Sequence, residues 1–416
     1  MPYYRIFCTF CTSRSEADRQ TTGNERNVCC IMPRKIVIIG ASELQNPLIL
    51  KAKEMGLETH VFAWECGDIG ERTADRFYPI SIVEKDRILA ICKEIQPVAV
   101  ASIASDLAAI TVNYLANALN LPTNPPETAF IASNKYAMRS AFQAAGIPTP
   151  AFAKVGVGDD LAPIRAMQLP IIVKPTDRSG SRGIYKLTSL EGLEDAIARS
   201  VEASFEKKAI VEEYIEGNEY SFEAISQNGQ HHYLTITKKF TTGSPHFIET
   251  GHLQPSDLDE ETMQHAKELV FRALDALHIT TGASHAEFKV LPGTKEIRLI
   301  EIGARMGGDC IGSDLVQLTT GYDFVRMVIE AAAGDPLNLS RQPTVPAAAV
   351  RYTFCDQDIA HYETVRATAA EHLHRASEMD STEGASVTDS STRFGFYIVT
   401  GDSQQEVCDL AQLDLE

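Results

Sequence analysis

The sequence lacks the features that a membrane or exported protein needs. No apolar stretch approaches the ~20 residues that span a bilayer, and the first residues do not form the apolar core of a secretory signal. Positive charge is also scarce, because 38 Lys and Arg residues stand against 56 Asp and Glu residues, a net charge of -18. This balance argues against nonspecific attraction to nucleic acid or to anionic membranes. We expect a cytoplasmic protein with no membrane and no nucleic-acid partner.

The composition is ordinary for a folded chain. The 416 residues are 44% hydrophobic and 23% charged. Because a typical domain has about 150 residues, this length predicts two or three compact domains. The nine cysteines are odd in number, and most lie singly, which suits a reducing compartment.

The first 31 residues show no sustained periodicity and are predicted to be a disordered extension, with Met32 a candidate native start. They contain four of the cysteines, namely Cys8, Cys11, Cys29 and Cys30. A zinc knuckle is one interpretation, and unpaired thiols are the other. The second pair is adjacent and no histidine lies nearby to complete a tetrahedral site, which favours unpaired thiols.

Residues 32–125 alternate between apolar strands and helices, which is typical of an open parallel α/β domain. KIVIIG predicts a buried strand, Glu43–Met55 a helix, and LETHVFAW the next strand. PVAVASI predicts a further strand, and Asp106–Leu119 follows it as a helix. The turn after the first strand begins at Gly40 and lacks the G-x-G-x-x-G spacing, so no dinucleotide site is expected.

Beyond residue 125 the pattern changes to hairpins with interspersed helices, as in an α+β domain. We predict a domain over residues 126–334, with one lobe at about 135–210 and another at about 211–334, and a C-terminal subdomain over 335–416. In that subdomain AAAVRYTF and FGFYIVTG are predicted strands. The polar segment His374–Thr392 between them is interpreted as a flexible excursion.

Asp177–Gly183 has the composition of a phosphate-binding flap. It lies between the predicted strands IIVKP and GIYKL, so it is a hairpin and not the strand-to-helix turn of a P-loop. Gly180 and Gly183 let backbone amides approach phosphate oxygens. Hydroxyl and guanidinium donors surround them, namely Arg178, Ser179, Ser181 and Arg182. An exposed polar hairpin is the alternative.

Two lysines support the phosphate-binding interpretation. Lys174 ends an apolar strand directly before the flap, where an ammonium is costly unless an anion meets it. Lys135 lies near the start of the predicted helix Asn134–Ala145, where a phosphate would offset the unfavourable helix dipole. Either lysine alone would be a solvated surface charge, but beside the flap both predict an anion site.

Glu287 and Glu301 lie on two predicted strands, SHAEFKVL and EIRLIEIGAR, whose connecting turn is centred near residue 294. A symmetric antiparallel hairpin would place the two carboxylates opposite each other on one side of the sheet. Two opposed carboxylates repel and need a cation, and hard oxygen ligands suit Mg²⁺ or Mn²⁺. The alternatives are a salt bridge to Lys289 or Arg305, or a register that separates the carboxylates.

AIVEEYIEGNE joins the flap region to this carboxylate pair. Its backbone around Tyr214 and Ile215 offers amides that would contact an adenine edge, and Glu219 offers a carboxylate to a ribose diol. A surface acidic hairpin is the alternative interpretation, especially for Glu213 and Glu216.

The order of these motifs resembles the ATP-grasp superfamily over roughly residues 32–400. The motifs are Lys135, Lys174-Pro175, D-R-S-G-S-R-G, E-E-Y-I-E-G-N-E, A-E-F and I-E-I-G-A-R-M-G-G-D. The resemblance implies an α/β and α+β architecture. It comprises an N-terminal preATP-grasp domain, a two-lobed ATP-grasp domain that closes over ATP, and a small C-terminal α+β subdomain. It also implies a ligase in which a carboxylate attacks the γ-phosphate and an amine then displaces phosphate from the acylphosphate.

The resemblance further implies roles for individual residues. The expected catalytic residues are Arg305, which stabilises the acylphosphate, Lys174 and Arg182. The expected ATP-binding residues are Lys135, Lys174, Ser179, Gly180, Ser181, Gly183, Glu212, Tyr214, Ile215 and Glu219. Glu287 and Glu301 become the metal carboxylates, with Mg²⁺ or Mn²⁺ as the metal.

Residues 240–253 are the expected substrate loop. Its side chains His246, Glu249 and His252 offer groups for an amine or carboxylate, and structural roles for the histidines are equally compatible with the sequence. The turn at Gly307 and Gly308, directly after Arg305, would expose amides to a carboxylate.

One position departs from the family pattern. Many relatives have asparagine two residues after the second metal glutamate, where this chain has Gly303. The branch resembled is that of L-amino-acid (dipeptide) ligases and carbamoyl-phosphate-synthase-like single units. We therefore expect an ATP-dependent amino-acid ligase that acts on small carboxylates and amines, with a homodimer as one compatible assembly. The alternatives are another small-carboxylate-activating enzyme and a non-catalytic ATP-binding regulator.

Overall fold

The computed structural model describes residues 33–178, 180, 182–244 and 246–415. The expectations for residues 1–31, Ser179 and Ser181 therefore lie outside the described residues. In the described part of the chain, no helix is long and apolar enough to cross a membrane. The five cysteines described there are free thiols, namely Cys66, Cys92, Cys310, Cys355 and Cys408.

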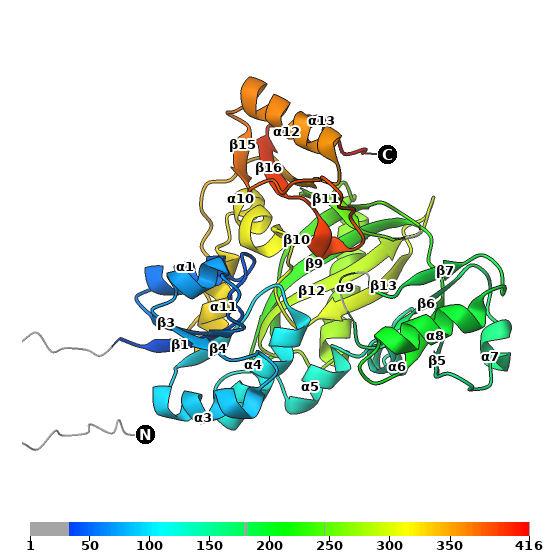
Figure 1. Ribbon diagram of the computed structural model, residues 1–416, viewed down its shortest axis with the longest axis horizontal. Coiled ribbons are helices and arrows are strands. Elements are labelled where there is room, and N and C mark those ends of the chain that lie inside the picture. Colours follow the sequence, from blue (N-terminus) through cyan, green and yellow to red (C-terminus); the bar gives the residue numbers. More distant parts are fainter. Residues whose placement is uncertain (1–32, 179, 181, 245, 416) are drawn as a thin grey trace, which may run out of the picture. The chain divides into compact units, whose positions relative to one another are not determined.

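The N-terminal part contains a four-stranded parallel sheet in the order β3-β2-β1-β4 (Figure 1), as the sequence predicted. The central strand is buried on both faces, because Ile36 and Ile38 pack into one apolar cluster while Val37 and Ile39 pack into another. The strands are β1 (Lys35–Ile39), β2 (Glu58–Ala63), β3 (Arg76–Pro79) and β4 (Ala99–Ala101). The helices are α1 (Asn46–Glu54), α2 (Ile69–Thr73), α3 (Lys85–Ile95) and α4 (Asp106–Ala118).

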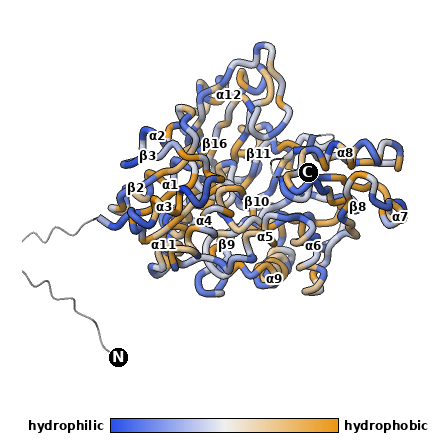
Figure 2. Tube along the Cα trace, turned by 60° about the horizontal axis from the view of Figure 1, so that its bottom comes forward, coloured by the Kyte–Doolittle hydropathy of each residue, from blue (hydrophilic) through white to orange (hydrophobic). Residues whose placement is uncertain are grey.

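The next part is a smaller antiparallel sheet in the order β5-β8-β6-β7. β6 and β7 pair directly, so the flap between them is a hairpin as predicted. Figure 2 shows orange and blue residues alternating along α8, whose apolar face packs on this sheet. The strands are β5 (Phe152–Val155), β6 (Ile171–Pro175), β7 (Tyr185–Leu187) and β8 (Ala209–Glu213). The helices from residue 126 to residue 203 are α5 (Pro126–Ile131), α6 (Lys135–Ala144), α7 (Ala162–Arg165) and α8 (Leu193–Ala203).

The rest of the chain contains a continuous eight-stranded sheet in the order β13-β12-β9-β10-β11-β14-β16-β15. The strands are β9 (Asn218–Gln227), β10 (Gln230–Thr241), β11 (Glu249–Gln254), β12 (Gly282–Val290), β13 (Ile297–Gly303), β14 (Ala347–Tyr352), β15 (Leu373–Ala376) and β16 (Phe396–Gly401). The helices are α9 (Glu260–Ala276), α10 (Val316–Thr320), α11 (Phe324–Ala333), α12 (Asp356–Thr368) and α13 (Gln404–Ala411). A π-helical turn (Ile311–Leu315) and a 3-10 turn (Ser390–Thr392) complete the set.

Arg34–Glu416 forms one compact unit, so the predicted inner boundaries at residues 125 and 334 remain predictions. Two features tie the predicted domains together. The side chains of α11 share an apolar cluster with β1 and α1 of the N-terminal part, and β14 pairs with β11 of the large sheet.

The segment His374–Thr392, interpreted as a flexible excursion, has no helix or strand between residues 377 and 389, but both of its ends are anchored. Its start lies in β15, which pairs with β16 at the end of the large sheet. Near its end, Asp389 caps the 3-10 turn, and Ser390 donates a hydrogen bond to Glu249 Oε2 at 2.7 Å. Part of the polar composition of the segment serves these anchoring hydrogen bonds.

Candidate active site

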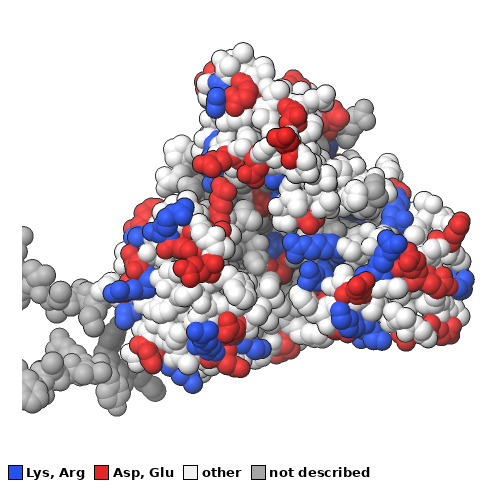
Figure 3. Space-filling view, viewed as in Figure 1, with Lys and Arg blue, Asp and Glu red and all other residues white. Residues whose placement is uncertain are grey.

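A cavity of about 420 Å³ lies where loops of the N-terminal sheet, the flap sheet and the large sheet meet. Figure 3 shows Lys and Arg side chains gathered beside a hollow in this face, with acidic side chains around it. Most of the described residues expected from the sequence line the cavity, namely Lys135, Lys174, Gly180, Arg182, Glu212, Tyr214, Ile215, Glu219, Glu249, His252, Glu287, Glu301, Arg305 and Gly308. His246, Gly183 and Gly307 are not among its lining residues.

Glu287 on β12 and Glu301 on β13 are direct partners in the antiparallel register, as predicted. The match depends on a β-bulge, since Phe288 pairs with Leu299 and Ile300 is the extra residue. Without that bulge Glu287 would face Ile300. The bulge therefore brings both carboxylates to one place on the sheet.

Both carboxylates are held by lysines, but not by the lysine that the sequence suggested. Lys239 Nζ lies 2.5 Å from Glu287 Oε1, and Lys135 Nζ lies 2.8 Å from Glu301 Oε1. Burial would raise the pKa of Glu287, but Lys239 and His285 hold it well below its usual range. Lys239 was missed by sequence reasoning. Its signal was a pair of adjacent lysines inside the strand-like segment TITKKFT, where strand alternation turns neighbours to opposite faces.

The two glutamates fit a Mg²⁺ ion. Among the described residues, the hydrogen bonds to both carboxylates go to Oε1, which leaves each Oε2 for another cation. No group of three or more His, Cys, Asp or Glu side chains suited to a metal occurs in the described ranges. Mg²⁺ commonly takes one or two protein carboxylates and completes its shell with phosphate oxygens and water, so two glutamates suffice.

Lys174 and Glu212 belong to a buried ion cluster with Arg139. Glu212 is 3% exposed, and Arg139 Nε donates to its Oε2 at 2.9 Å while Lys174 pairs with its Oε1. Burial would raise the pKa of Glu212, but Arg139 and Lys174 lower it to about 2. Burial lowers the pKa of Lys174, and Glu212 opposes that shift. The anion that Lys174 was predicted to need is thus supplied in part by the protein itself.

The segment after β8 lies at the cavity as the adenine hinge was predicted to do. The Tyr214 N–H is not available to a ligand, however, because it donates to Pro170 O at 2.9 Å. The Tyr214 ring instead stacks under Lys186 Nζ, which lies 3.6 Å from the ring centroid. Glu219 Oε1 lies 3.2 Å from Lys239 Nζ.

Arg305 is paired with an aspartate from the N-terminal part. Its Nε and Nη2 donate to the two carboxylate oxygens of Asp106 at 2.8 and 3.3 Å. Burial would raise the pKa of Asp106, but Arg305 lowers it. Sequence reasoning missed Asp106, although it lies just beyond the carboxyl end of a parallel strand, where ligand sites gather.

This ion pair explains the glycine at position 303. A Cβ at Gly303 would lie 3.0 Å from both Arg305 Nε and Asp106 Oδ1, which is tighter than ordinary contacts. An asparagine side chain at this position would collide with the ion pair. The arrangement of Asp106 and Arg305 therefore leaves little room for a side chain at position 303.

We expect Gly303→Asn to lower the free energy of unfolding by about 1–3 kcal/mol through overpacking. Gly293→Asn is the matched control, because a Cβ at Gly293 meets nothing within 4 Å and asparagine tolerates its positive φ of 67°. Urea unfolding of both variants measures the difference. Equal stabilities of the two variants would show that residue 303 has room for a side chain.

The predicted substrate loop runs from the end of β10 through the β10–β11 connection into β11, and it brings two of its three residues to the cavity. His246 is exposed and lies away from the lining, so its expected substrate role is not supported by its position. His252 is 1% exposed, and neither ring nitrogen has a hydrogen-bond partner within the described part of the chain. Burial lowers the pKa of His252, so its imidazole is neutral at pH 7. Its Nε2 lies 3.9 Å from Asp309 Oδ2, so a carboxylate of the protein is already beside that nitrogen.

Arg393 fixes the wall beside His252. It donates to both oxygens of Asp309 at 3.0 and 2.8 Å and to Glu249 O at 3.3 Å. Its guanidinium lies 3.6 Å from the centroid of the Tyr352 ring. Sequence reasoning missed Asp309 and Arg393, because their partners are up to 144 residues apart along the chain.

His285 also lines the cavity and was missed. Its Nδ1 lies 2.6 Å from Glu223 Oε1, and its Nε2 lies 3.3 Å from Glu287 Oε1. Burial would lower the pKa of His285, but Glu223 and Glu287 raise it to about 9. Gly307 packs against the His285–Glu223 pair, since a Cβ at Gly307 would lie 2.8 Å from Glu223 Oε2. Gly307 thus permits close packing behind the cavity.

Comparison with known proteins identifies a domain family and a shared fold. Residues 167–314 match the ATP-grasp domain family, so the chain carries an ATP-grasp domain. The L-amino acid ligase from Bacillus licheniformis has the same fold, with a TM-score of 0.76 and 23% identity over 91% of this chain and 97% of that one. The resemblance of motifs noted in the sequence is thereby confirmed.

The chain is related to alanine–anticapsin ligase of Bacillus subtilis, with 30% identity over 200 residues and 42% of each chain covered. It is also similar to D-alanine–D-alanine ligase B of Chromobacterium violaceum, with 30% identity over 184 residues, covering 42% of this chain and 58% of that protein. The chain thus spans about half the length of these curated relatives.

Proposed function

We propose that the protein is an ATP-dependent carboxylate–amine ligase that forms an amide or peptide bond between amino acids and releases ADP and phosphate. The observation that carries the proposal is that Glu287 and Glu301 face each other in the same cavity as Lys135, Lys174 and Arg305. A carboxylate pair for a divalent cation, cations for phosphate and a fixed guanidinium are what acylphosphate chemistry requires. The similarity to ligases named for alanine and D-alanine supports amino-acid substrates.

Each group has a role in the proposed site. Glu287 and Glu301 would hold Mg²⁺, which neutralises charge on the phosphates when it is bound. Lys135, Lys174 and the flap residues Gly180 and Arg182 would bind the phosphates. The hinge at Ile215 would contact adenine, and Glu219 would accept the ribose hydroxyls. Because Glu212 is committed to a buried ion cluster, its proposed part in ATP binding is to position Lys174.

In the first step an oxygen of the substrate carboxylate would form a bond to the γ-phosphorus, and the bond between that phosphorus and ADP would break. Next, the amine nitrogen would bond to the carbonyl carbon, phosphate would leave, and the amine would lose a proton. Arg305 lies at the cavity wall with a charge held in place by Asp106, so it would stabilise the developing oxyanion in both steps. Glu249 and the neutral His252 would orient the amine or carboxylate partner.

We expect ADP release with ATP and Mg²⁺ to require two partners from a matrix of amino acids. Mass spectrometry should find a product equal in mass to the two partners less water. Release that is independent of a second partner would indicate a different carboxylate-activating enzyme, such as a carbamoyl-phosphate-synthase-like unit. ATP binding without ADP release from any partner would contradict the proposal.

The second candidate is a non-catalytic ATP-binding regulator. Gly303 favours it, because the asparagine that many relatives use as a metal ligand is missing. Metal-dependent turnover with any substrate pair would exclude this candidate.

A further inference from the structure

A second cavity of about 90 Å³ lies behind the Asp106–Arg305 ion pair. It is lined by residues of β4, α4 and α5 and by parts of β12 and α11. Asp106 and Arg305 line both this cavity and the candidate active site. The ion pair is therefore shared by the two cavities.

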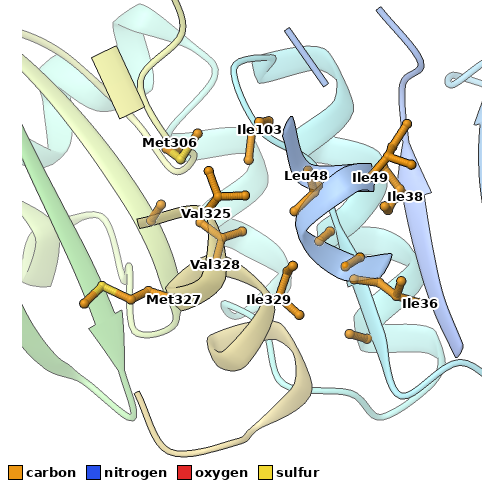
Figure 4. Close-up of a cluster of buried hydrophobic side chains, with 14 of the residues drawn as sticks. Ile36, Ile38, Leu48, Ile49, Ile103, Met306, Val325, Met327, Val328 and Ile329 are labelled. Carbon is orange, nitrogen blue, oxygen red and sulfur yellow. The ribbon is translucent and has the colours of Figure 1, made fainter. Parts of the chain in front are cut away.

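Away from the Asp106–Arg305 ion pair, the walls of this second cavity combine apolar side chains with polar side chains that bond largely to the protein. Its polar side chains already bond to the protein, since Asn113 Nδ2 donates to Asn124 O at 2.8 Å and Ser133 Oγ donates to Ala129 O at 2.6 Å. The remaining walls are largely small or apolar, and Met306 and Val328 also belong to the adjoining core cluster drawn in Figure 4. A cavity with such walls favours an aliphatic occupant over water.

The shared end of the cavity is charged and still has free hydrogen-bonding capacity. Arg305 donates to Asp106 twice and to Met306 O at 3.4 Å, which accounts for three of its five N–H donors. Two donors remain for a carboxylate, and the Asp106 oxygens can accept from an ammonium. The charges and the apolar walls together match a small aliphatic amino acid.

We infer that this cavity receives the aliphatic side chain of an amino-acid substrate, whose ammonium meets Asp106 and whose carboxylate meets Arg305 at the active site. The inference rests on the proposed ligase function. A volume of about 90 Å³ is smaller than that of an apolar cavity of ~150 Å³ that binds benzene, and it suits a side chain of a few carbon atoms. The substrate class is thus valine-like, with a branched or short aliphatic side chain.

The test measures binding of L-valine and of glycine by calorimetry, with Mg²⁺ and a non-hydrolysable ATP analogue. We expect valine to bind at least about tenfold more tightly than glycine, since one methylene in an apolar pocket is worth 10- to 200-fold. Ala109→Leu fills the cavity from α4 and should remove this advantage while leaving glycine binding within about twofold. Ala118→Leu, an exposed position on the same helix, is the matched control and should change neither affinity.

Val328→Ala enlarges the cavity and should shift the preference toward L-leucine, so the test stands even where Ala109→Leu fails to fold. Valine binding that is absent, or that is unchanged in both variants, would overturn the inference. If ADP release occurs with amino acids while the variants do not discriminate among them, the inference falls and the ligase function stands. If valine binding depends on Ala109 but no partner releases ADP, the ligase function falls and the valine site stands.

Discussion

Glu301→Ala should reduce ADP release by at least about 1,000-fold, because a metal at a phosphoryl group supplies several kcal/mol and each 1.36 kcal/mol is tenfold in rate. Glu301 is one of the two opposed carboxylates, and its loss would leave Glu287 as the sole glutamate for the metal. It would also release Lys135, whose ammonium lies 2.8 Å from Glu301 Oε1. Steady-state ADP release as a function of Mg²⁺ concentration measures the effect.

Glu296→Ala is the control for that experiment, because Glu296 is an exposed residue just before the same strand. Its activity should match that of the unmodified protein. The two-carboxylate metal site would be refuted if Glu301→Ala kept its turnover and its Mg²⁺ dependence.

Glu212→Ala should lower the free energy of unfolding by about 3–5 kcal/mol, since it leaves two buried cations without their counter-ion. Arg139 is 1% exposed and Lys174 5%, so water screens the two cations only weakly. The same variant should weaken ATP binding, because Lys174 would no longer be held at the cavity wall. Glu216→Ala, which removes an exposed carboxylate on the following turn, should have little effect on stability.

The contribution of Glu212 should depend on pH in a defined direction. Its pKa is lowered from an ordinary value of 4.5 to about 2 in the folded protein, so the folded state prefers the carboxylate form. The stabilisation is therefore complete above about pH 4.5 and is lost as the pH falls toward 2. Urea unfolding of the original protein and of Glu212→Gln between pH 7 and pH 3 measures the difference. If the difference in free energy of unfolding between the two proteins stayed constant across this range, Glu212 would not be an ionised carboxylate in the folded state.

Local sequence patterns predicted the N-terminal parallel sheet, the flap hairpin and the pairing of Glu287 with Glu301. The N-terminal parallel sheet followed from apolar runs that alternate with helices, and the flap hairpin followed from two strands around a glycine-rich turn. The Glu287–Glu301 pair followed from hairpin symmetry, but it depends on a bulge at Ile300 that no local pattern indicated.

The partners of these residues could not be predicted in the same way. Asp106 and Arg305 are 199 residues apart, and Lys239 and Glu287 are 48 apart on strands whose register only the folded sheet defines. Arg393 lies beyond a polar segment that looked like a loop. In each case the choice of partner depends on tertiary packing and on the need to satisfy buried charges, which a single sequence does not encode locally.

The pairing of β11 with β14 limits where the chain can be shortened. β11 carries Glu249 and His252, and its other edge is covered by Ala348–Arg351 of β14. A shortened chain that ends before residue 347 would leave the backbone N–H and C=O groups of that edge open to pairing with other molecules. The last 70 residues therefore act as a cover for the strand that bears the candidate substrate groups. A version of the protein without them should be prone to self-association.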